Sequence, residues 1–156
     1  MMPSRSIKLG ICQKLDFTVS VYSGNGDRFA RIFMRTWLRL PESIRSKILE
    51  YWSTENTPTV LIELSNLWKN HKTRLAEVGF LGYEVKFNAT EFDRMNDSVA
   101  QCSIAHELGH VYQHAMGLIT GTSEDEDGVI TFLNDWGFGA EWLEEAQWKA
   151  QNFPPN

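Results

Sequence analysis

The chain has 156 residues, 42% of them hydrophobic, which is enough for one domain with a proper core and too few for two of ordinary size. Its net charge of −5 and scattered basic residues exclude a basic stripe of the kind that follows a phosphate backbone, so no nucleic-acid partner is expected. No apolar run approaches the roughly 20 residues of a membrane helix, and no signal peptide is recognised. We therefore expect one cytoplasmic domain over residues 1–156 with no membrane partner.

The first half of the chain predicts strands alternating with helices. Residues 15–22 alternate in polarity and are rich in β-branched and aromatic types, which predicts a strand. Apolar residues at helical spacing predict helices around 29–37 and 44–52 that meet near Leu40. The apolar stretch 59–64 is typical of a strand, although its length also allows the start of a helix.

The middle of the chain predicts a short helix, a strand and a long helix. A helix is plausible over 65–77, closed by Gly79. Residues 83–87 alternate, as in a half-buried strand. Good helix-capping residues at 96–98 begin a stretch free of proline, which predicts one long helix over 97–116.

Two further helices are predicted at the C-terminal end, over about 123–135 with Gly137 as its cap and over 141–151. In the second, Trp142, Leu143 and Ala146 are expected to face the core, and the glutamates of that stretch to face solvent. Strands come early and helices late, so the fold class is α+β. Cys12 and Cys102 are expected to be small buried residues of a reduced protein, with a disulfide between them left open.

His106, Glu107 and His110 form an HExxH pattern inside the long helix. Residues four apart lie on one helix face, so the two imidazoles converge and can bind one tetrahedral zinc ion at about 2.0–2.1 Å. Glu107 can take a proton from a zinc-bound water and return it to a leaving amine. A chance spacing is the alternative, but the helix is apolar around the motif, and burying an unpaired histidine pair would be costly.

The stretch Ile104-Ala105-His106-Glu107-Leu108-Gly109-His110-Val111 resembles the active-site helix of the zincin metallopeptidases. The resemblance implies a small mixed sheet whose edge strand, here 83–87, packs on the HExxH helix and binds extended peptide, with further helices following. It also implies that His106 and His110 are ligands of one zinc ion and that Glu107 is the general base. The rest of the chain supports similarity only at the level of the superfamily.

A catalytic zinc site needs a third protein ligand. Met116 stands where metzincins carry their third histidine, so that subclass is excluded, and His114 lies a further turn along the helix. A carboxylate from the next helix is expected instead, as in gluzincin-like enzymes, and Glu126 is preferred. It begins an ExxVI stretch resembling the ExxAD of several gluzincins, although Val129-Ile130 departs from its Ala-Asp. The alternatives left open are Asp125, Glu124, Asp127 and the glutamates Glu141, Glu144 and Glu145.

The expected function is that of a zinc-dependent metallopeptidase, an endopeptidase acting on a peptide or protein through a Glu107-activated water. The alternative is a zinc-binding regulatory or interaction protein of zincin fold with little or no proteolysis. That alternative predicts a fourth protein ligand, Cys102 or His114, which would close the metal shell. A hydrolase of non-peptide substrates is a third possibility. The substrate, the oxyanion-stabilising residue and the oligomeric state are left open.

Overall fold

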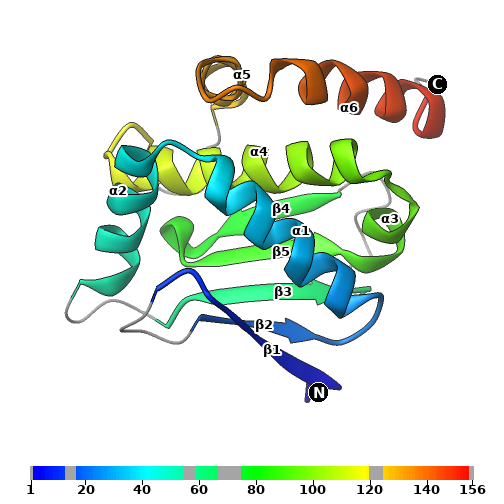
Figure 1. Ribbon diagram of the computed structural model, residues 1–156, viewed down its shortest axis with the longest axis horizontal. Helices are drawn as coiled ribbons and strands as arrows, with labels where there is room; N and C mark the ends of the chain where they lie inside the picture. Colours follow the sequence, from blue (N-terminus) through cyan, green and yellow to red (C-terminus); the bar gives the residue numbers. More distant parts are fainter. Residues whose placement is uncertain (1, 13–16, 55–58, 67–74, 120–124, 155–156) are drawn as a thin grey trace.

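The computed structural model describes residues 2–12, 17–54, 59–66, 75–119 and 125–154. One five-stranded sheet has the strand order β1-β2-β3-β5-β4 (Figure 1). The strands are β1 (Arg5–Leu9), β2 (Phe17–Val21), β3 (Leu61–Ser65), β4 (Ala76–Gly79) and β5 (Glu84–Asn88). The three central strands are parallel, and β1 and β4 pair antiparallel at the two edges of the described sheet. The sheet is therefore mixed.

Six helices accompany the sheet in the described part of the chain, so the predicted α+β class is confirmed. They are α1 (Gly26–Arg39), α2 (Glu42–Ser53), α3 (Ala89–Arg94), α4 (Asp97–Ala115), α5 (Glu126–Asp135) and α6 (Gly139–Asn152), with a short 3-10 turn η1 (Phe80–Gly82). Helix α1 crosses the sheet, α4 runs beside β4, and α5 and α6 lie on the side of α4 away from the sheet (Figure 1). None of the helices in the described ranges is both long and apolar enough to cross a membrane.

Aromatic side chains join α1 to the sheet and to the start of the long helix. Phe29 of α1 is fully buried, with ring centroids 5.1 Å from Phe87 of β5 and 4.9 Å from Phe92 of α3. Rings at these distances add about 0.5–1.5 kcal/mol per pair beyond the area they bury. The cluster holds α3, and with it the chain entering α4, against the sheet.

Strand β5 confirms the predicted alternation but not the predicted position. Val85 and Phe87 are buried while their neighbours are half-buried. The strand pairs with β3 on one side and with β4 on the other, so the expectation that 83–87 forms the edge of the sheet is wrong. Alternation reports which face of a strand is buried and carries no information on its neighbours. The edge nearest α4 is β4.

The predicted helix at 65–77 is wrong where the structure describes it. Ser65 ends β3, and Ala76–Gly79 forms β4. Residues 67–74 lie outside the described residues, as do 15 and 16 of the predicted first strand. Strand β1 and the six-residue helix α3 were not predicted, although Ile7 and Leu9 alternate with polar residues in β1.

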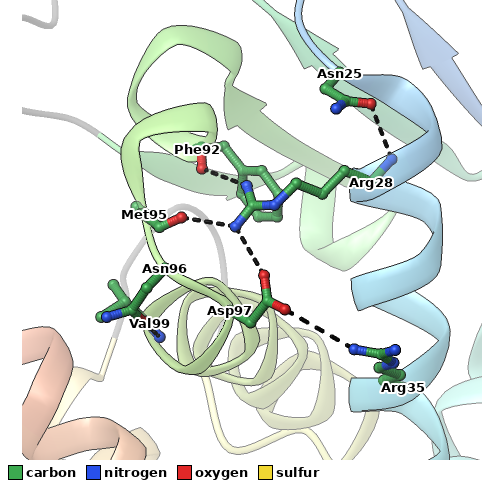
Figure 2. Close-up of polar contacts among 8 residues, drawn as sticks. All are labelled: Asn25, Arg28, Arg35, Phe92, Met95, Asn96, Asp97 and Val99. Atoms are coloured by element: carbon green, nitrogen blue, oxygen red, sulfur yellow. Dashed lines mark hydrogen bonds and ion pairs between the residues drawn. The ribbon is translucent and has the colours of Figure 1, made fainter.

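Arg28 fixes the N-terminal end of α4 to α1 (Figure 2). Its guanidinium donates to the carbonyl oxygens of Phe92 at 3.1 Å and Met95 at 2.6 Å, and to the carboxylate of Asp97 at 3.1 Å. The Asn96 side chain caps α4 by accepting from the Val99 amide at 2.9 Å. Arg28 thus holds both the end of α3 and the beginning of α4.

Arg39 makes a second set of contacts at the other end of α1. Its guanidinium donates to Gln101 of α4 at 2.8 Å and to the carbonyl oxygen of Gly137 at 2.9 Å, and it lies 3.0 Å from a carboxylate oxygen of Glu141. The same group stacks on Phe138, 4.1 Å from the ring centroid. One side chain therefore joins α1 and α4 to the junction between α5 and α6.

Candidate metal centre

Helix α4 places His106 and His110 side by side. Ile104, Leu108 and Val111 are completely buried and anchor the opposite side of the helix in the core. The two imidazoles lie one turn apart, with ring centroids separated by 5.0 Å. The side chain of His106 is 12% exposed and that of His110 only 1%. The convergence predicted from the spacing is confirmed.

Glu126, the first residue of α5, completes a group of three donors. One of its carboxylate oxygens lies 2.7 Å from Nε2 of His106 and the other lies 3.1 Å from Nε2 of His110. One potential ligand atom from each residue lies within 4.8 Å of the others. Two imidazole nitrogens and one carboxylate are a donor set used by catalytic zinc sites. The structure thus brings together the three residues preferred from the sequence.

Gln113 fixes the orientation of the His110 ring. Its side-chain Nε2 donates to the carbonyl oxygen of Asp125 at 2.8 Å, so its Oε1 is left to face Nδ1 of His110 at 2.9 Å. Because this oxygen can only accept, Nδ1 of His110 carries the proton. The lone pair of a neutral His110 is then on Nε2, the atom that points toward Glu126 and that a metal would need.

A metal ion would compete with protons for the donor atoms of His106, His110 and Glu126. Burial by itself lowers the pKa of His110, but the hydrogen bond to Glu126 and the charge of Glu107 outweigh burial and raise it to about 9. Hydrogen bonds from the two histidines hold the pKa of Glu126 well below its usual range. Without metal the carboxylate is therefore matched by protonated imidazole. A divalent cation replaces that positive charge, so the donor set fits a metal ion.

Glu107 is buried beside the histidine pair, with 8% of its surface exposed. Its negative charge contributes to raising the pKa of both His106 and His110, against the effect of burial. The residue predicted to be the general base thus lies within electrostatic reach of both proposed ligands.

The other carboxylates considered as the third ligand are not part of the three-donor group in the described residues. Asp125 caps α5 by accepting from the Gly128 amide at 3.0 Å, and Asp127 is exposed. Glu124 lies outside the described residues. Glu141 pairs with Arg39, and Glu144 is exposed.

The predicted buried face of α6 is only partly confirmed, because Trp142 packs against the core but Leu143 and Ala146 do not. Leu143 is 58% exposed and Ala146 is exposed, whereas Glu145 is only 3% exposed. Glu145 accepts from the ammonium of Lys149 at 2.7 Å. Helix α6 therefore packs a polar side against α4, because its acidic residues find cationic partners at the interface.

Cys102 and His114 lie near the site without joining the donor group. Cys102 is completely buried, as predicted, and burial together with Glu145 raises the pKa of its thiol. Cys12 is only partly buried, and both cysteines are free thiols. His114 packs against Gly82, and burial and the charge of His110 lower its pKa.

The sequence did not identify Gln113, and it suggested Glu145 only as an alternative third ligand with a solvent-facing side chain. Gln113 lies three residues after His110 and hence on the same helix face, a spacing that could have identified it. Glu145 left no such signal, because its burial depends on how α6 docks. Searches of protein-family models, curated proteins and solved structures found no match to this chain.

Proposed function

We propose that this protein is a zinc-dependent peptidase in which His106, His110 and Glu126 hold the ion and Glu107 is the general base. The observation that carries the proposal is the meeting of both histidine Nε2 atoms with one carboxylate, 2.7 and 3.1 Å away, beside a buried glutamate. When bound, a zinc ion supplies Lewis acidity that polarises a carbonyl and acidifies water. Glu107 takes the proton of the attacking water and delivers it to the leaving amine nitrogen.

The edge strand β4 is the proposed place for an extended peptide substrate. In the described sheet β4 pairs with β5 and forms an edge, the position at which an extended peptide adds to a sheet. Helix α4, which carries the histidines, packs against the same strand. A peptide methylated at its backbone nitrogens should therefore compete poorly with the unmodified peptide.

The second candidate function is zinc binding without catalysis. The number of donors in the site argues against it. That role would favour a closed shell with a fourth protein ligand. Cys102 and His114, the two residues considered for it, are not in the three-donor group. Among the described residues the group has three donors, and a fourth coordination position left for water or substrate supports catalysis. The cobalt-substituted protein should accordingly lack the absorbance of a thiolate ligand.

The proposal is tested by zinc content together with peptide hydrolysis. Mass spectrometry should find one zinc per chain in the wild type and in His114→Ala, and little in His106→Ala, His110→Ala or Glu126→Ala. Glu107→Gln should keep the zinc while hydrolysis of a peptide library falls by a factor of at least about 100. A wild type that takes up no zinc, or a Glu107→Gln variant that cleaves normally, would refute the proposal.

A further inference from the structure

The two histidines differ in how their second ring nitrogen is held. Nδ1 of His110 is bonded to Gln113 at 2.9 Å. Nδ1 of His106 is also buried, yet it has no hydrogen-bond partner among the described residues. A histidine that binds metal through Nε2 almost always donates its other ring N–H to an oxygen, and this bond fixes the orientation of the ring. One proposed ligand is thus held in place and the other is not.

One carboxylate oxygen of Glu145, on α6, is also buried without a hydrogen-bond partner in the described part of the chain. Glu145 is 3% exposed, and its Oε1 accepts from Lys149 at 2.7 Å. Its Oε2 is buried and likewise has no hydrogen-bond partner within the described residues. A buried donor or acceptor without a partner has lost its hydrogen bonds to water, so each of these two atoms favours a bond to the other.

The packing of α6 on α4 places Glu145 on the correct side of His106. Cys102 lies one turn before His106 on the same face of α4, and the Glu145 carboxylate is near enough to raise the pKa of its thiol. Side chains of a helix lean toward its N-terminus, so the ring of His106 leans toward the turn that carries Cys102. The charge of Glu145 also acts on His106. Glu141 also has a buried oxygen without a partner among the described residues, but its carboxylate is paired with Arg39.

Metal binding supplies a reason for this bond to form. Tetrahedral zinc ligands about 2.0–2.1 Å from the ion lie about 3.3 Å apart. The present 2.7 Å contact between His106 and Glu126 must therefore lengthen when an ion enters. The ring of His106 can shift without breaking a bond at Nδ1.

We propose that Glu145 is the positioning residue for His106, with its Oε2 accepting a hydrogen bond from Nδ1–H of His106 when the metal is held. The inference rests on the proposed metal site. Lys149 holds the other carboxylate oxygen and so fixes the direction of the acceptor. The two ligands on α4 then have separate supports, Gln113 within the helix and Glu145 from α6.

The competing explanation is that Glu145 serves only the Glu145–Lys149 ion pair at the helix interface. Three variants of the full chain separate these roles. Glu145→Gln removes the charge and keeps the size of the side chain. The double variant Glu145→Met, Lys149→Met removes the whole pair and leaves no buried unpaired charge, so it keeps the helices packed. Glu141→Gln is the matched control, one turn away on the same helix.

Zinc affinity is measured by competition with a chromophoric chelator, and the His106 ring N–H by proton–nitrogen NMR of the zinc form. The double variant should fold, bind zinc about 10- to 100-fold more weakly, and lose the His106 Nδ1–H signal to exchange with water. Glu145→Gln should shift that signal, and Glu141→Gln should match the wild type in both measurements. Unchanged affinity and an unchanged signal in both Glu145 variants would overturn the inference. A wild type that binds zinc but cleaves no peptide would instead refute the peptidase, and the affinity comparison would still decide the role of Glu145.

Discussion

Gly109 of α4 lies directly under Val129 of α5, so closely that a Cβ atom added to the glycine would be 2.9 Å from a methyl carbon of the valine. Gly109 is one of the two residues between Glu107 and His110 in the HExxH motif. Its missing side chain lets α5 approach α4 and bring Glu126 to the two histidines. The glycine therefore contributes to the proposed metal centre without supplying a donor atom.

Gly109→Ala should weaken zinc binding, because the added methyl pushes α5 and Glu126 away. Overpacking costs about 1–3 kcal/mol and the better helix propensity of alanine returns about 1 kcal/mol, so the free energy of unfolding should fall by at most about 2 kcal/mol. Zinc titration and urea unfolding measure the two effects. Adding Val129→Ala should restore part of the affinity. A single variant that binds zinc like the wild type would show that the contact is irrelevant.

Gln113→Leu should reduce zinc affinity by about 10- to 100-fold, because His110 loses the acceptor that orients its ring. The Asp125 carbonyl loses its donor in the same variant, so the start of α5 should also loosen. Gln113→Glu should recover much of the affinity, since a carboxylate still accepts from Nδ1. Competition with a chelator measures the zinc affinity of both variants. If both lose the same affinity, Gln113 does not orient the His110 ring.

Arg28→Ala should lower the free energy of unfolding by about 2–4 kcal/mol while leaving zinc affinity nearly unchanged. The loss is large because the Phe92 and Met95 carbonyl oxygens and Asp97 share this one cation. Arg35→Ala is the control, because Arg35 is exposed and lies 3.9 Å from Asp97. Urea unfolding should show a change of less than about 0.5 kcal/mol for this control.

The metal-free protein should be most stable between about pH 4.5 and 6.5. The pKa of His110 is raised from 6.5 to about 9, so its contribution is fully present below pH 6.5 and is lost as the pH rises through 9. The pKa of Glu126 is lowered from 4.5, so its contribution is present above that pH and is lost on acidification. Urea unfolding with a chelator present tests this, and Glu126→Gln should flatten both sides of the profile.

Much of the candidate site could be predicted because its signals are local. The spacing of His106 and His110 fixes their convergence on any helix, and Asn96 marks where that helix begins. Glu126 and Asp125 could be ranked above Glu124 and Asp127 because they lie at the edges of the apolar face of α5, and the ExxVI stretch favoured Glu126. Each of these inferences needs only the geometry of one helix.

The wrong predictions concern contacts between helices and strands that lie far apart in the sequence. The alternation of β5 hides the fact that it has two neighbours, and the rule that apolar helix residues face inward fails for α6. Glu145 is buried and paired with Lys149 where α6 meets α4, and this arrangement is not apparent from periodicity. Arg28 likewise depends on contacts across more than sixty positions of sequence.

Arg39 makes contacts with residues that are synthesised much later than Arg39 itself. Two of its partners follow Glu126 in the chain: the Gly137 carbonyl oxygen lies between α5 and α6, and Glu141 lies in α6. A nascent chain on the ribosome lays down the sheet, α1 and the histidine helix first, and both histidines then await a carboxylate that has yet to emerge. At the proposed site, metal could therefore be loaded only after α5 has been synthesised.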